Sequence, residues 1–123
     1  MITPKESVDA LIEHFWQNGY LTLSRKYGTY LPAPKKVGDY EVDAVARYKQ
    51  KIAIGISLSE EELNDPKVIT KITFLASRHR ENAGRRITLF VAVPAESLSK
   101  AKIIISSLDE QLKKNIKVVP IHS

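Results

Sequence analysis

Two acidic residues, Glu41 and Asp43, lie on the first of two adjacent strands that the sequence predicts. Residues i and i+2 of a strand share a face, so these carboxylates are expected to point to one side, together with Val45 and Arg47. Carboxylates grouped on one side of neighbouring strands can share a hard, oxygen-preferring ion such as Mg²⁺. The acidic pair is therefore the first candidate site. The opposite face of this strand is expected to carry Tyr40, Val42 and Ala44.

Basic residues gather in the loop that precedes this strand pair. Nineteen lysines and arginines against fourteen acidic residues give a net charge of +5, which favours an anionic partner because cations release counterions from phosphates. Tyr27 and Tyr30 lie between the loop's cations, so phosphate-binding and base-stacking groups occur together there. The alternative is that these charges only maintain solubility. The candidate nucleic-acid contacts are Arg25, Lys26, Lys35, Lys36 and Arg47.

The sequence excludes several other chemistries. It has no cysteine, which rules out disulfides, thiolate zinc sites and cysteine nucleophiles. His14, His79 and His122 lack metal-ligand spacing and are expected to be structural or solvated. The motifs of nucleotide-binding loops and hydrolase nucleophile elbows are missing. No apolar run approaches the roughly 20 residues that cross a bilayer, and residues 3–6 are unlike a signal peptide's apolar core, so we expect a cytoplasmic protein without membrane contact.

The predicted elements form one domain over residues 1–123, long enough to bury a core without disulfides or metal. Thr3-Pro4-Lys5-Glu6 is a capping box with proline at the first helical position, which predicts a helix over residues 4–18. One apolar stripe of this helix is formed by Val8, Leu11, Ile12, Phe15 and Trp16.

A strand meander followed by strand-helix-strand units predicts an α/β domain with a mixed central sheet and helices on both faces. The β-branched run Ile103-Ile104-Ile105 is the one place where a strand could compete with a helix. The sequence signals for these elements are alternating apolar residues, an Asp-Pro helix start and an almost continuously apolar run over residues 87–93. In chain order they are a strand over residues 20–24, two strands around Asp43 and Ile54, a helix from Pro66 to a stop at Gly84, a strand over 87–93, a helix over 97–114 and a strand over 116–121.

This order resembles the core of the PD-(D/E)XK nuclease superfamily, the fold of restriction endonucleases and archaeal Holliday junction resolvases. The resemblance covers nearly the whole chain and rests on element order and the strand pair. It implies a restriction endonuclease-like α-β-β-β-α-β-α-β core. In that family an Asp near the start of the second core strand and an acid on the third bind Mg²⁺, and a lysine two residues after the acid activates water. Asp43 matches the first of these positions.

The strand after Asp43 departs from the family's pattern. Counting along residues 53–57 places Gly55 at the acid position and Ser57 at the lysine position. Glycine cannot ligate a metal through a side chain, and a serine hydroxyl supplies no fixed positive charge. The usual active site therefore cannot form from these two strands. The alternative for Asp43 is a solvated or ion-paired residue, for example one that pairs with Arg47.

Neighbouring elements offer substitutes, because some members of the superfamily are thought to supply the acid or the lysine from elsewhere. Glu60 opens a run of three glutamates after the third strand and joins Asp43 and Glu41 as a candidate metal ligand. Lys71, on the following helix, is the candidate to replace the catalytic lysine beside Asp43. The alternative for the glutamate run is a solvated turn that favours the next helix N-terminus through its dipole.

Three hypotheses follow. The leading one is a nucleic-acid (DNA) binding protein of nuclease ancestry with a degenerate active site and no cofactor. The second is an active Mg²⁺-dependent DNA endonuclease that uses Asp43 with a relocated acid and Lys71. The third is a protein-interaction or scaffold module, including a homodimer through an apolar helix face. Fold alone does not decide among them.

Overall fold

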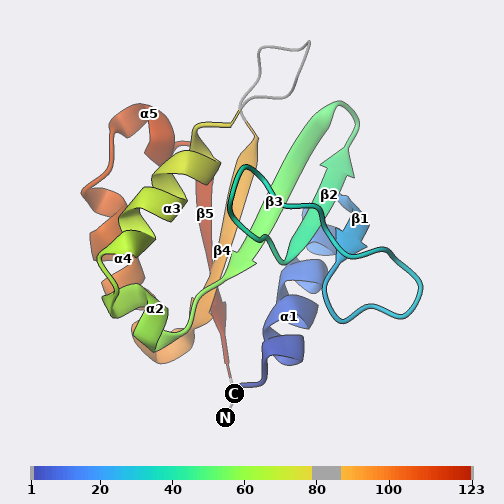
Figure 1. Cartoon of the computed structure of the whole chain (residues 1–123), viewed down its shortest axis with the longest axis horizontal. Helices are drawn as coiled ribbons and strands as arrows, with labels where there is room; N and C mark the ends of the chain where they lie inside the picture. The colour runs from blue at the N-terminus through green and yellow to red at the C-terminus, as the bar shows by residue number, and fades with distance from the viewer. Residues whose placement is uncertain (1, 79–86, 123) are drawn as a thin grey trace.

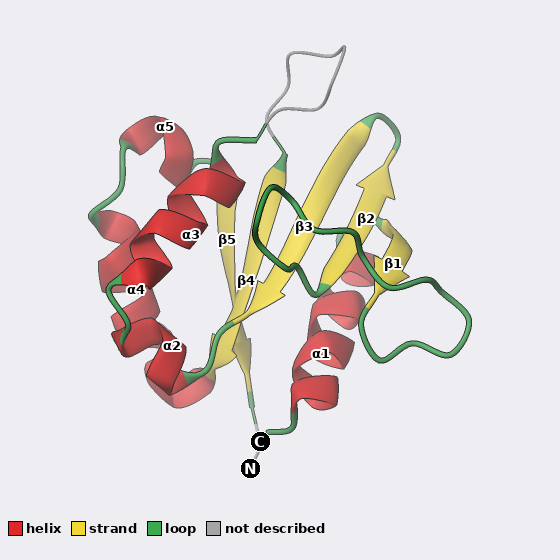
Figure 2. Ribbon diagram, viewed as in Figure 1, coloured by secondary structure: helices red, strands yellow, loops and turns green. Residues whose placement is uncertain are grey.

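The computed structural model describes residues 2–78 and 87–122 and contains a mixed five-stranded sheet with helices on both faces (Figures 1 and 2). This confirms the predicted α/β architecture. Strands lie in chain order across the sheet. The first three are antiparallel, and the last two run parallel to the third. The strands are β1 (Leu21–Arg25), β2 (Ala44–Tyr48), β3 (Lys51–Ser57), β4 (Thr88–Pro94) and β5 (Ile116–Ile121).

Helix α1 (Pro4–Gln17) begins with the predicted capping box. The Thr3 hydroxyl accepts the Glu6 backbone N–H at 3.1 Å, and the Glu6 carboxylate accepts the Thr3 N–H at 3.2 Å. Two orphan amides at the start of the helix are thereby satisfied. The prediction of a helix over residues 4–18 is confirmed to within one residue at its end.

Among the helices of the described residues, α1 is the one that covers the first face of the sheet. Leu11 and Phe15 are fully buried, and they pack against small alanine side chains of β2 and β3 and against Phe90 of β4. Small residues let the helix approach the sheet closely. Trp16, predicted in the same buried stripe, is instead 77% exposed. The apolar stripe of α1 is wider than the part of the helix that contacts the sheet, and Trp16 lies at the edge of this stripe, outside the contact.

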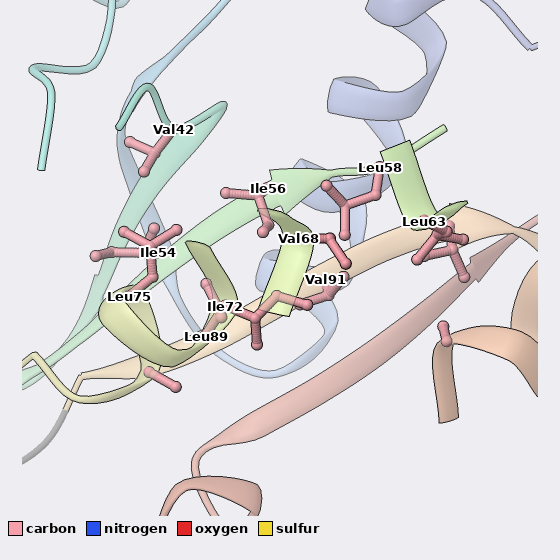
Figure 3. Close-up of a cluster of buried hydrophobic side chains, with 13 residues drawn as sticks. Val42, Ile54, Ile56, Leu58, Leu63, Val68, Ile72, Leu75, Leu89 and Val91 are labelled. Atoms are coloured by element: carbon pink, nitrogen blue, oxygen red, sulfur yellow. The ribbon is translucent and has the colours of Figure 1, made fainter. Parts of the chain in front are cut away.

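The opposite face of the sheet is covered by α2 (Glu60–Asn64), α3 (Lys67–Ala76), α4 (Leu98–Ser106) and α5 (Glu110–Lys113). Figure 3 shows the apolar cluster between this layer and the sheet. No helix within residues 2–78 and 87–122 has the length and apolarity needed to cross a membrane. The buried side chains that join α2 and α3 to β3 and β4 include Ile54, Ile56, Leu63, Val68, Ile72, Leu75, Leu89 and Val91.

The predicted glutamate turn is a helix, and the predicted helix after it is shorter than expected. The Ser59 hydroxyl accepts the Glu62 N–H at 3.2 Å and the Glu62 carboxylate accepts the Ser59 N–H at 3.1 Å, a second capping box that begins α2. Asp65 then accepts the Lys67 N–H at 3.0 Å at the start of α3. Gly84, the predicted stop, lies outside the described residues.

The single helix predicted over residues 97–114 is wrong, because the chain forms a short 3₁₀ turn, α4 and α5 there. The hydroxyls of Ser106 and Ser107 each donate a 2.6 Å hydrogen bond to a backbone carbonyl three residues earlier. Serines that bond locally in this way compete with helix continuation. Asp109 then accepts the Gln111 N–H and begins a new helix.

The chain enters β2 through a bend at Asp43, which corrects the predicted alternation. Val42 packs in the α3-side cluster with Ile54, as Val45 does, whereas Ala44 packs in the α1-side cluster. Strand alternation therefore begins only at Ala44. The predicted common face of Tyr40, Val42 and Ala44 is wrong, since Val42 and Ala44 lie on opposite sides of the sheet.

Candidate functional site

Asp43 lies where the entry to β2 meets the end of β3, and its side chain is 15% exposed. One carboxylate oxygen accepts the Ser57 backbone N–H at 2.7 Å and the Ser57 hydroxyl at 3.3 Å. The other oxygen lies 3.5 Å from the Lys26 ammonium nitrogen. The antiparallel register, in which Ala44 pairs with Gly55, brings Ser57 to this position. The cation beside Asp43 is thus Lys26 and not Arg47.

These surroundings do not fit a magnesium site. Mg²⁺ requires close to octahedral coordination by oxygens, whereas the Asp43 carboxylate is already bound to two donors of Ser57 and to an ammonium group. Glu41 and Glu60 are exposed to solvent. Within the described part of the chain, no three acidic or histidine side chains are grouped so that they could hold a metal ion. The predicted ligands Asp43, Glu41 and Glu60 are therefore not brought together.

Gly55, at the position that the resemblance assigns to the second acid, faces the α1 core. A Cβ added to Gly55 would lie 2.9 Å from the Phe15 ring and 3.2 Å from Leu11. Both neighbours are fully buried. The space that an acidic side chain would need is consequently filled by apolar groups.

Lys71, the candidate replacement for the catalytic lysine, lines a small hollow of about 140 Å³. The hollow also involves Tyr40, Leu58 and Val68, on the side of the sheet covered by α3. Asp43 does not line this hollow. The lysine that pairs with Asp43 is instead Lys26, which directly follows β1 and was expected from the sequence only as a nucleic-acid contact.

Two of the five predicted nucleic-acid contacts already have acidic partners. Arg25 is only 16% exposed and donates to the Asp9 carboxylate at 2.5 Å and to the Lys26 carbonyl at 3.1 Å. The Arg25 hydrogen bond, supported by Lys5, lowers the pKa of Asp9 despite partial burial. Lys26 is the partner of Asp43. These two cations fasten the loop to α1 and to β2.

The other three predicted contacts, Lys35, Lys36 and Arg47, are exposed and pair with no carboxylate of the described residues. Lys35 and Lys36 line a groove of about 560 Å³ between the loop and the strands, which we name the lysine groove. Arg47 follows Val45 on the same side of β2 and pairs across the sheet with Ile52. The apolar lining of the lysine groove includes Leu23, Ala33, Val37, Val45, Ile52 and Ile54.

The same loop exposes two tyrosine rings. Tyr27 is 54% exposed and Tyr30 is 96% exposed. Tyr27 also has a φ of 60°, in the left-handed region that bulky residues rarely adopt. The loop that carries Tyr27, Tyr30, Lys35 and Lys36 extends beside β1 and then crosses in front of β2 (Figure 1).

Comparison of the chain with protein-family models, with curated protein sequences and with solved structures gives no match. The geometry of these residues is therefore the basis for inferring function. Two arrangements stand out: a carboxylate at Asp43 that is occupied by structural partners, and a loop whose lysines and tyrosines face solvent.

Proposed function

We propose that this chain is a non-catalytic domain that binds single-stranded nucleic acid and has a PD-(D/E)XK nuclease-like core. Support for that core comes from the order of α1, three antiparallel strands, α3 and the parallel β4 and β5. The partners of Asp43 and the packing at Gly55 support the loss of metal-dependent chemistry.

The observation that carries the proposal is the exposure of unpaired cations and aromatic rings on one loop. Lys35 and Lys36, with Arg47 nearby on β2, can bind successive phosphates. Tyr27 and Tyr30 offer ring faces on which bases can stack, at about 1–3 kcal/mol per base. Intramolecular ion pairs of Arg25 and Lys26 hold the loop near α1 and β2. Because the loop is already held in place, it loses less conformational entropy when it binds a ligand.

The backbone of Tyr27 gives separate support. A bulky residue at a φ of 60° costs about 1–3 kcal/mol, and such conformations concentrate at binding sites. The strain is accompanied by exposure of the ring and not by its burial in the core. More than half of the surface of Tyr27 therefore stays open to a ligand.

The lining of the lysine groove favours a single strand over a duplex. Its walls are mostly aliphatic, so they suit the apolar faces of unstacked bases. A duplex presents mainly its phosphates to a surface of this kind, and it would use the cations alone. Because few polar groups line the groove, we expect little base preference.

The test is fluorescence anisotropy of a labelled oligothymidine and of a duplex across a salt series. We expect tighter binding of the single strand and weaker binding as salt rises. The double variant Lys35→Gln/Lys36→Gln should bind more weakly, with a log–log salt slope shallower by about 1.4, because two phosphate contacts are lost. The double variant Lys100→Gln/Lys102→Gln removes the same charge from exposed positions on α4 and should bind as the unmodified protein does. Absence of binding at low salt would refute the proposal, as would equal losses in the two variants.

A second comparison isolates the tyrosines. Tyr30→Ala should weaken binding of the single strand by about 5- to 150-fold, the equivalent of one lost stacking contact. Its salt slope should stay unchanged, since no charge is removed. Ile103→Ala, at a position 70% exposed on α4, is the matched control for removing an exposed apolar side chain. Unaltered affinity of Tyr30→Ala would exclude stacking on this ring.

A further inference from the structure

A hollow of about 610 Å³ lies beside the exposed indole of Trp16. One flank of α1 lines it with residues at helical i, i+3, i+4 and i+7 positions, and β1 and the following loop contribute Leu21 and Leu31. We name this surface the Trp16 patch. Its apolar members are Ile12, Trp16, Tyr20, Leu21 and Leu31, and its polar members are Asp9, Glu13, Thr22 and Arg25.

The exposure of the apolar members is unusual. Trp16 is 77% exposed, Leu21 65% and Leu31 39%, and all three line one hollow. Contiguous apolar surface of this kind marks an interaction site, and an aromatic anchor surrounded by polar residues is the usual anatomy of a protein interface. The Trp16 patch therefore fits a protein partner.

The charges of the patch favour a second copy of the chain as that partner. The hollow is lined by two carboxylates, Asp9 and Glu13, and by one cation, Arg25, so it offers no excess of positive charge to an anionic polymer. Asp9 is paired with both Lys5 and Arg25, so this surface is close to neutral although the whole chain has a net charge of +5. Two copies of a basic protein repel each other, and this repulsion is weakest when the near-neutral patch of one copy contacts the same patch of the other.

The shape of the patch also suits a two-fold axis. In a two-fold interface the same surface serves both protomers, so it must contain both a projecting group and a site that receives it. The Trp16 side chain is largely exposed and also lines the hollow, so the patch holds both a group that a partner can cover and a site that can receive one. We propose that the chain forms a two-fold homodimer through the Trp16 patch, with Trp16 of each protomer seated in the hollow of the other.

Side chains, and not strand pairing, make this interface. β1 is an edge strand, but its register with β2 shifts between Thr22 and Ser24. The Arg25 N–H is already bonded to the Pro32 carbonyl at 3.0 Å. Bulges and occupied backbone groups protect an edge from joining a second sheet. What the β1 edge offers to a partner is therefore the apolar side-chain surface of Leu21 and its neighbours, and not backbone groups for strand pairing.

The dimer would carry two copies of the loop proposed to bind nucleic acid, since Leu31 belongs to that loop. Self-association does not rest on that function, and it is measured without nucleic acid. A monomeric protein could therefore still bind nucleic acid, and a dimer could form without that activity, so each proposal is tested by its own experiment.

The first test is the molar mass of the full chain in solution, measured by light scattering and sedimentation over a wide concentration series. We expect a mass that rises from monomer to dimer, whereas Trp16→Ala and Leu21→Asp remain monomers with unchanged circular dichroism. Ile103→Asp places the same new charge at a position 70% exposed on α4, and it should dimerise normally. A monomer at every concentration, or a dimer that persists in both patch variants, would overturn the proposal.

The second test uses Trp16 as a probe, because it is the only tryptophan in the chain. Its fluorescence should shift to shorter wavelength with rising protein concentration, as the indole leaves water. The Leu21→Asp variant should keep the emission of a water-exposed indole throughout. Emission that is independent of concentration in the unmodified protein would contradict burial of Trp16 between protomers.

Discussion

The carboxylate of Asp43 accepts a 2.7 Å hydrogen bond from the backbone N–H of Ser57, so the position that family resemblance assigns to a catalytic lysine serves as a backbone donor here. The bond joins the entry of β2 to the end of β3. Lys26 then neutralises the same carboxylate from the end of β1. Asp43 thus links three strands, and its charge is balanced by the protein itself.

Removing this carboxylate should destabilise the fold. Asp43→Ala leaves the Ser57 N–H without its acceptor and Lys26 without its partner, so we expect the free energy of unfolding to fall by about 1–3 kcal/mol. Urea unfolding followed by circular dichroism measures the change. Lys26→Ala should cost less, because the bonds to Ser57 remain. Asp39→Ala, at an exposed loop position, is the matched control, and a loss for it equal to that of Asp43→Ala would show that the bond is not responsible.

The same pairing predicts the absence of metal-dependent cleavage. Plasmid and branched DNA incubated with the protein in Mg²⁺ or Mn²⁺ should stay intact, because the carboxylate of Asp43 is held by an ammonium group and two donors of Ser57. Thermal unfolding should be unaffected by either ion, since a ligand stabilises only the state that binds it. Cleavage by the unmodified protein, lost in Asp43→Ala, would establish the active-endonuclease alternative instead.

Gly55 should resist substitution because of Phe15. Gly55→Ala brings a methyl group to 2.9 Å from the Phe15 ring, and overpacking of this kind costs about 1–3 kcal/mol of unfolding free energy. In a Phe15→Leu background the ring is gone, so the same substitution should cost much less. A double-mutant cycle by urea unfolding isolates this coupling. Additive effects in the cycle would indicate that Gly55 is required for another reason.

Local sequence signals predicted the elements well where a short contiguous stretch decides the outcome. The Thr3 capping box begins α1, and the strand predicted over residues 116–121 is β5. Helix periodicity also identified Leu11 and Phe15 as core residues, but it could not exclude Trp16. Burial depends on how wide a strip of α1 the sheet covers, and that width is set by tertiary packing.

Sequence patterns could not predict that Lys26 and Ser57 are the partners of Asp43. Lys26 meets Asp43 across a long loop, and no spacing rule connects residues so separated. The contact with Ser57 depends on the bend at Asp43, which interrupts the alternation that strand periodicity assumes. The antiparallel pairing of β2 with β3 was the one available signal, since it places the end of β3 near the entry of β2.

His14 should make the stability of the fold depend on pH near neutrality. Its ring packs edge-on to Phe90 at a centroid distance of 5.6 Å. Burial, with a smaller contribution from the charge of Lys117, lowers the pKa of His14 below its ordinary value of 6.5. The unfolded chain therefore takes up the proton first as pH falls. We expect full stability above about pH 7 and a progressive loss as the pH drops through 6.5 toward the lowered pKa of the folded state.

Urea unfolding at a series of pH values tests this expectation. His14→Gln removes the titrating ring and should flatten the profile between about pH 5 and 7, whereas His122→Gln, at an exposed position, should leave its shape unchanged. Asp9, whose pKa is lowered chiefly by its hydrogen bond from Arg25, contributes a separate loss of stability only in acid, below its ordinary value of 3.8. A decline between pH 7 and 5 that survives in His14→Gln would assign it to another group.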